Sequence, residues 1–141
     1  IETESLLIDA ACMEFIRSPN SFDVVVGSNL FGDILTDIGG MITGSIGLSG
    51  SANIDPERRF PSMFEPVHGS APDIAGKGIA NPIAAILSGA MMLRHLGKKA
   101  AGSEIEAAVL KVLGNGTILT PDLGGKSNTV DMGDSIVAAL T

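Results

Sequence analysis

Residues 28–37 have the sequence SNLFGDILTD, and they follow a strand-like stretch, FDVVV, at residues 22–26. Ile34 and Leu35 lie between two acids, Asp33 and Asp37, which indicates a helix with one apolar face. Acids four apart on a helix share a face, with Cβ atoms about 5–6 Å apart, and they repel each other. A divalent cation such as Mg²⁺ would bind both carboxylates. The spacing alone leaves open a metal site or a solvated face near a helix N-terminus, where negative charge is favoured.

Composition narrows the classes of partner. The chain has 141 residues, a 45% apolar content and a mean hydropathy of +0.36, which is enough for a packed core. Its formal charge is −7 and it has no run of basic residues. Because nucleic acids and anionic membranes attract clustered Lys and Arg, we expect neither as a partner.

The chain also has no obvious targeting or membrane signal. Its longest uncharged stretch, residues 78–93, falls short of the roughly 20 apolar residues that span a bilayer. Ile1 does not open a basic-then-apolar leader, and the single Cys12 has no partner for a disulfide. We therefore interpret Cys12 as a small core residue rather than a nucleophile, and we expect a reducing, cytoplasmic location.

Alternating strand and helix patterns predict an α/β architecture. We expect a flexible segment at residues 44–51 and strands at residues 22–26 and 62–66. The expected helices are residues 4–17, a helix ending near Met41, one that begins at Asn81-Pro82 and stops at Gly97, residues 104–113 capped by Ser103, and one from Asn128 or Thr129 to about Leu140.

The loop between Glu65 and Asn81 has the composition of a ligand clamp. Gly69, Gly76 and Gly78 permit positive φ and close backbone approach, and the following helix N-terminus favours anions. It lacks the third glycine and the later acid of a Rossmann dinucleotide fingerprint. An ordinary surface connection remains the alternative, and His68 by itself is more typical of a hydrogen-bonded loop histidine.

Two motifs in order are far more specific than either alone. NLFGDILTD at residues 29–37, followed by FEPVHGSAPDI at residues 64–74 and then Asn81-Pro82, resembles the decarboxylating β-hydroxyacid dehydrogenases. That family contains isocitrate, isopropylmalate and tartrate/D-malate dehydrogenases. The resemblance covers essentially the whole chain but only the C-terminal two fifths of a family member. It implies the isocitrate/isopropylmalate dehydrogenase fold, which is not a Rossmann fold, incomplete in this chain. Residues 51–62 look closest to the tartrate/D-malate branch.

The resemblance also implies a division of labour along the chain. Residues 1–43 correspond to part of a small, dimer-forming domain, and residues 44–141 to the C-terminal part of a large cofactor-binding domain. Asp33 and Asp37 match ligands of a Mg²⁺ or Mn²⁺ ion, and Asp9 matches an aspartate given to the neighbouring subunit's site. We expect Asp9 to be buried on an apolar helix face, and the protein to be a homodimer with shared active sites.

The loop matches the family's cofactor site. Glu65 corresponds to the nicotinamide end, whereas the other matching positions follow the adenosine part: His68, Gly69, Ala71, Asp73, Ile74 and Asn81. Asp73 matches the acceptor of both ribose hydroxyls, while members that use NADP have a basic–aromatic pair at Asp73-Ile74. A carboxylate there would repel a 2′-phosphate. The expected cofactor is therefore NAD. The bland alternative is that Asp73 only caps the turn at residues 74–76.

The family's catalytic Tyr and Lys lie upstream of Ile1, and the chain contains no Tyr. The chain is therefore not expected to be active alone. For the full-length protein we expect NAD- and metal-dependent oxidative decarboxylation of a malate-type 2-hydroxy acid, such as tartrate or D-malate. The alternatives are 3-isopropylmalate dehydrogenase of leucine biosynthesis and a non-catalytic fold or assembly module.

Overall fold

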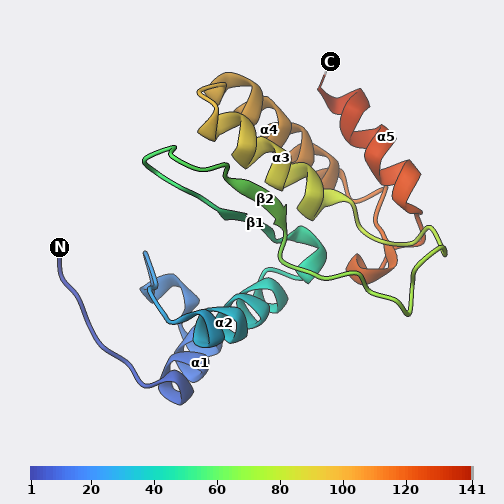
Figure 1. Cartoon of the computed structure of the whole chain (residues 1–141). Helices are drawn as coiled ribbons and strands as arrows, with labels where there is room; N and C mark the ends of the chain where they lie inside the picture. Colours follow the sequence, from blue (N-terminus) through green and yellow to red (C-terminus); the bar gives the residue numbers. More distant parts are fainter. Residues whose placement is uncertain (141) are drawn as a thin grey trace. The chain divides into compact units, whose positions relative to one another are not determined.

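The computed structural model describes residues 1–140, and these form two compact units, Ile1–Gly44 and the part that begins at Ser45. Figure 1 shows the elements of each unit. We describe each unit by itself. The division falls one residue after the domain boundary expected at residue 43, and the roles expected for the two domains stay predictions.

The first unit contains two packed α-helices. α1 (Ile8–Arg17) contacts α2 (Asn29–Ile42), with a short 3₁₀ turn, η1 (Pro19–Ser21), after α1. Ala11 of α1 and Leu35 and Gly40 of α2 are buried. α1 begins four residues later than expected, because Leu7 is extended and no side chain caps the helix. A longer helix would gain no packing there, since residues 1–7 are exposed.

The prediction of a strand at residues 22–26 is wrong. The sheet of the described residues contains only two strands, both in the second unit. Val24 and Val26 expose 84% and 92% of their surface, so they are not buried as the β-branched run suggested. A β-strand needs a hydrogen-bonded neighbour, and no ladder in the described part of the chain includes these residues.

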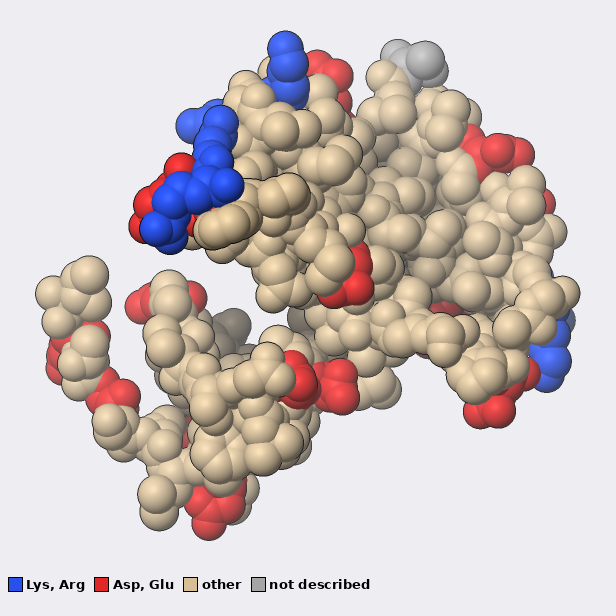
Figure 2. Space-filling view, viewed as in Figure 1, with Lys and Arg blue, Asp and Glu red and all other residues tan. Residues whose placement is uncertain are grey.

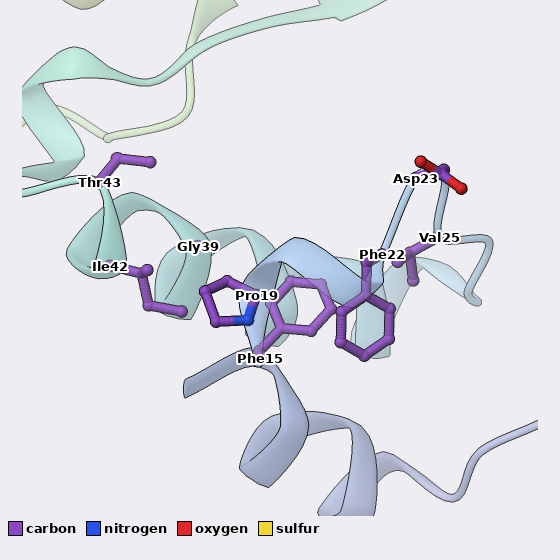
Figure 3. Close-up of a pocket in the computed structure, with 8 residues that line it drawn as sticks. All are labelled: Phe15, Pro19, Phe22, Asp23, Val25, Gly39, Ile42 and Thr43. Atoms are coloured by element: carbon purple, nitrogen blue, oxygen red, sulfur yellow. The ribbon is translucent and has the colours of Figure 1, made fainter. Parts of the chain in front are cut away.

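A shallow apolar hollow of about 280 Å³ lies in the first unit. The rings of Phe15 and Phe22 contact each other in it at a tilt of 53°, with centroids 4.7 Å apart, and Pro19 also lines it (Figure 3). Ile42 of α2 lines it as well. The lining of this hollow is mostly apolar, and Asp23 is its single charged residue.

The second unit begins with a hairpin. β1 (Gly50–Asn53) pairs antiparallel with β2 (Met63–Pro66), with Gly50 opposite Pro66 and Asn53 opposite Met63. Residues 44–51 are therefore not the flexible segment expected, because they contain the 3₁₀ helix η2 (Ile46–Leu48) and the start of β1. At the tip of the hairpin, the Asp55 carboxylate accepts the main-chain N–H groups of Glu57, Arg59 and Phe60. The bond from Phe60 is the largest influence on the Asp55 pKa, which is lowered.

Three helices cover the rest of this unit: α3 (Ile83–His95), α4 (Lys99–Asn115) and α5 (Thr129–Ala139), with the 3₁₀ helix η3 (Pro121–Leu123) before α5. α3 packs against the hairpin and α4, and α4 against α5 (Figure 1). Their facing side chains form the core, which consists of Ile83, Ala108, Val109, Val112, Met132 and Ile136.

Local signals predicted the ends of α3 and the start of α5 correctly. The Asn81 side chain accepts the N–H of Ile83 at 3.0 Å, as an N-cap does. At the other end Gly97 has φ +83°, while Gly97 and Lys98 donate to the carbonyls of Arg94 and Leu93, the two bonds of a Schellman motif. Asn128 and Asp131 cap each other's main chain at the start of α5.

α4 is longer than the expected helix at residues 104–113. It starts at Lys99, so Ser103 lies inside the helix, where its hydroxyl accepts a bond from Arg94 rather than capping. The packing of α3 on α4 explains the sequence at this point. A Cβ at Gly102 would lie 2.9 Å from the carbonyl oxygen of Ala90, so only glycine allows this close helix crossing.

Candidate functional site

Asp33 and Asp37 lie on α2, and both are exposed, while Leu35 between them is buried. The helix thus presents two carboxylates on a surface away from its packed residue, as the spacing of four predicted. The Asn29 amide donates to Asp33 Oδ2 at 3.4 Å. The donor set fits part of a site for a hard divalent cation, which takes carboxylate and amide oxygens. Two carboxylates do not complete one.

Asp9 is in the first turn of α1 and is exposed, so the expectation that it is buried is wrong. Its Oδ1 accepts the main-chain N–H of Ala10 at 2.8 Å. It does not join Asp33 and Asp37, because nowhere in residues 1–140 do three His, Cys, Asp or Glu side chains gather as a metal site would require. The assignment of Asp9 to a neighbouring subunit's site stays a prediction.

The loop after β2 contains strained and permissive backbone. Gly76 and Gly78 have φ values of +76° and +66°, and no atom outside their chain neighbours comes within 4 Å of a Cβ placed on either. Ala71 has φ +44°, a left-handed conformation that costs a residue with a Cβ about 1–2 kcal/mol. Strain of this kind is concentrated at ligand-binding segments. Glu65 at its start is exposed, and His68 Nδ1 donates to the Gly69 carbonyl at 3.1 Å.

Asp73 and Ile74 lie in a turn that main-chain bonds close. Ile74 N–H donates to the Ala71 carbonyl, Ala75 N–H to that of Pro72, and Lys77 N–H to that of Ile74. The exposed Asp73 carboxylate makes no hydrogen bond with any residue in the described range 1–140. The turn therefore does not depend on an Asp73 cap, and the carboxylate is available to a ligand.

Asn81 is buried, and its side chain is used inside the protein. Its Oδ1 accepts from Ile83 N–H, while its Nδ2 donates to Asp122 Oδ2 at 3.0 Å. The same Asp122 oxygen accepts from the buried Ser45 hydroxyl at 2.5 Å, and that hydroxyl accepts from Gly47 N–H. Ser45, Asn81 and Asp122 thus form one network that joins η2, the start of α3 and η3.

The Asp122 pKa is lowered from its ordinary value of 3.8. Partial burial alone would raise it, but the hydroxyls of Ser45 and Thr120 and the Asn81 amide together favour the charged carboxylate. The fully buried Thr120 hydroxyl influences this carboxylate without the geometry of a full hydrogen bond, and it has no hydrogen-bond partner among the described residues. Sequence reasoning missed Asp122 and Ser45. The polar side chain of Asp122 in a turn-rich segment was the only local signal.

In Figure 2, acidic side chains are scattered over the visible face, whereas Lys and Arg side chains form one larger group and a smaller separate one. None of the helices in the described residues is long and apolar enough to cross a membrane.

A sequence model described as isocitrate/isopropylmalate dehydrogenase matches residues 1–136. The chain belongs to this family, and its fold is that of the family.

Relatives named for different substrates have similar sequence identity to this chain. The chain is 58% identical over 133 residues to a 3-isopropylmalate dehydrogenase of Corynebacterium jeikeium, which covers 94% of this chain and 38% of the relative. It is 52% identical over 140 residues to a probable tartrate dehydrogenase/decarboxylase of Bacillus subtilis, covering 99% and 39%. The chain thus spans about two fifths of the length of these relatives.

Solved structures agree on the fold. The isocitrate dehydrogenase of Methylococcus capsulatus matches with a TM-score of 0.89 and 47% identity, over 94% of this chain and 39% of the other. The β-decarboxylating dehydrogenase of Thermococcus kodakarensis matches with a TM-score of 0.83 and 48% identity, over 99% and 40%.

Proposed function

We propose that the full-length protein containing this chain is an NAD-dependent, divalent-metal-dependent dehydrogenase that oxidatively decarboxylates a malate-type 2-hydroxy acid. The observation that carries the proposal is the pair of exposed carboxylates on α2, Asp33 and Asp37, in a chain of a family whose named relatives are decarboxylating dehydrogenases. Two acids four residues apart repel each other and destabilise a helix, and a bound cation would remove this repulsion.

Asp33 and Asp37 would hold a Mg²⁺ or Mn²⁺ ion, and Asp9 would complete the site of a second subunit. When bound, the metal supplies Lewis-acid chemistry at the oxygen atoms of the hydroxy acid. The contribution of this chain is to hold negative charge at fixed positions on a helix that packs against α1 and buries Leu35. By the family resemblance, the catalytic Tyr and Lys would come from the part of the full-length protein that this chain does not contain.

The exposed loop from Glu65 to Asn81 would bind NAD. Asp73 is the proposed acceptor of both ribose hydroxyls of the adenosine, since its carboxylate is not used by the turn that contains it. Ile74 would flank the adenine. Because both polar ends of the Asn81 side chain bond within the protein, we propose that Asn81 meets the adenine through its main chain.

His68, Gly69 and Ala71 would contact the adenosine half, and Glu65 the nicotinamide end. The left-handed Ala71 holds this part of the loop in a shape that costs backbone strain, which supports a binding role.

The protein is proposed to act as a homodimer. Large apolar side chains are exposed on both helices of the first unit, including Met13 and Ile16 on α1 and Leu30 and Met41 on α2. Exposed apolar surface on this scale is typical of an interface. In such a dimer, Asp9 of one subunit is proposed to complete the other subunit's site, as the family resemblance implies. A soluble, cytoplasmic location is also proposed, because the named relatives are metabolic enzymes.

A second substrate has specific support. The 58% identical relative of Corynebacterium jeikeium is named 3-isopropylmalate dehydrogenase, so this activity is the alternative. Steady-state assays of the purified full-length protein with D-malate, tartrate and 3-isopropylmalate, each with NAD and Mn²⁺, separate the two. A kcat/KM at least tenfold higher for 3-isopropylmalate would replace the malate-type proposal. No turnover of any of the three would favour a non-catalytic module.

A further inference from the structure

Thr129, the first residue of α5, makes hydrogen bonds to the loop at residues 65–81 although it is not part of that loop. Thr129 N–H donates to the Gly78 carbonyl at 2.8 Å, and the Thr129 hydroxyl donates to the Ala80 carbonyl at 2.6 Å. Thr129 is 49 residues from Ala80 in the chain. The Asn128–Asp131 capping box fixes the helix start at this position.

The next residue of the loop is held from a second direction. Asn81 donates to the Asp122 carboxylate, which the Ser45 hydroxyl also contacts. The space around this network is tightly filled, since a Cβ at Gly47 would come within 2.8 Å of Asp122 Oδ2 and 2.9 Å of Asn81 Cβ. Thr129 therefore holds Gly78 and Ala80, and Asp122 holds Asn81, through separate hydrogen bonds.

The segment they hold needs such support. Gly76 and Gly78 have positive φ, and a Cβ added to either would meet no atom within 4 Å, so this glycine-rich stretch has conformational freedom to lose when it binds a ligand. A loop already fixed in its binding shape avoids that cost. Neither Asp122 nor Thr129 lies in the loop itself.

We propose that Asp122 and Thr129 are positioning residues for the adenine end of the dinucleotide site, acting through residues 78–81. The inference rests on the proposed function, because it takes this loop as the NAD site. We expect their effect to be on cofactor affinity alone, since both residues belong to the second unit, whereas the carboxylates that would bind the metal belong to α2 of the first unit.

Steady-state kinetics of the full-length protein test this proposal with two variants of Thr129. Thr129→Val removes the hydroxyl and keeps the shape and the main-chain N–H, whereas Thr129→Ser keeps the hydroxyl. We expect Thr129→Val to raise the KM for NAD and the inhibition constant of ADP-ribose by about three- to tenfold, the effect of one lost hydrogen bond. kcat at saturating NAD and the KM for the hydroxy acid should stay within about twofold of wild type, and Thr129→Ser should restore the KM for NAD.

Asp122→Ala should raise the same two constants, and Thr117→Val, at an exposed threonine of the same unit, should change neither. If Asp122→Ala fails to fold, the Thr129 pair decides the question alone. A wild-type KM for NAD in Thr129→Val, or a Thr129→Ser variant no better than Thr129→Val, would overturn the inference while leaving the NAD assignment intact. A wild-type protein that neither turns over NAD nor binds NADH would refute the proposed function itself, and the inference with it.

Discussion

Gly47 and Asp122 are 75 residues apart in sequence, yet a single methyl group on Gly47 would lie 2.8 Å from the Asp122 carboxylate. The same methyl would lie 2.9 Å from Asn81 Cβ. Glycine is required here by close approach rather than by an unusual φ, because Gly47 is not among the residues with positive φ. The polar network of Ser45, Asn81 and Asp122 can form only around a residue without a side chain.

Gly47→Ala should therefore destabilise the protein by about 1–3 kcal/mol, the usual cost of overpacking. Thermal unfolding of the full-length variant measures it. Gly133→Ala is the matched control, since Gly133 lies inside α5 with no atom near its added Cβ, and helix propensity should make this change stabilising by about 0.5–1 kcal/mol. Equal melting temperatures for the two variants would contradict the packing argument.

Asp122 should make a pH-dependent contribution to stability. Its pKa is lower in the folded protein than its ordinary value of 3.8, so the folded state favours the charged carboxylate. The stabilisation is present above pH 3.8 and is lost as the pH falls through the lower, folded pKa. Wild type should exceed Asp122→Asn in stability by a constant margin from pH 7 to about pH 5, and the margin should shrink below pH 3.8.

Denaturant unfolding at a series of pH values measures that margin. Asp134→Asn, at an exposed aspartate of α5, is the control and should show little difference from wild type throughout. A margin for Asp122→Asn that grows as the pH falls would mean that the sign is reversed and the network does not stabilise the charge.

Asp33→Asn should abolish metal-dependent turnover while leaving NADH affinity nearly unchanged. Replacing even a group that supports a metal ligand costs about 10–100-fold, so loss of a ligand should lower kcat/KM by more than about 100-fold. NADH fluorescence titration measures the cofactor affinity separately. Glu2→Gln, at an exposed acid of the same unit, should leave both quantities as in wild type. A parallel loss of NADH affinity in Asp33→Asn would argue against separate metal and cofactor sites.

Asp73→Lys combined with Ile74→Tyr should shift cofactor preference from NAD towards NADP. The change removes a carboxylate that would repel the 2′-phosphate and adds an attractive charge. Because a charged hydrogen bond contributes about 1.5–3 kcal/mol, the ratio of kcat/KM for NAD to that for NADP should fall by at least about tenfold. Glu104→Lys is the control for a charge reversal on an exposed site of the same unit. If the double variant keeps the wild-type ratio, Asp73 is not the ribose acceptor.

Local chemistry explains which parts of the fold could be predicted from sequence. Asn81, Gly97 and Asn128 determine helix ends through contacts with residues a few positions away, so their roles can be inferred from short motifs. Ser103 looked like a cap, but α4 continues through it because Gly102 allows α4 to pack closely on α3. That contact is made by a different helix and leaves no local signal.

The candidate site divides in the same way. Asp33, Asp37 and the loop around Asp73 lie in continuous motifs, and the spacing of the two α2 acids alone implied a shared helix face. Asp122 and Thr129 act through bonds that span 41 and 49 residues, so no pattern near either residue revealed them. The burial expected for Asp9 failed because its helix begins only at Ile8, which leaves Asp9 in an exposed first turn.

The exposed valines of residues 24–26 have a practical consequence for handling this chain on its own. Three consecutive β-branched residues with no ladder partner in the described range form a ready template for β-pairing with another molecule. Concentrated solutions of the 141-residue polypeptide should therefore self-associate with a gain in β-structure, and Val25→Lys should suppress that association. The Val25→Lys variant would therefore be the better sample for crystallisation or spectroscopy of the 141-residue polypeptide.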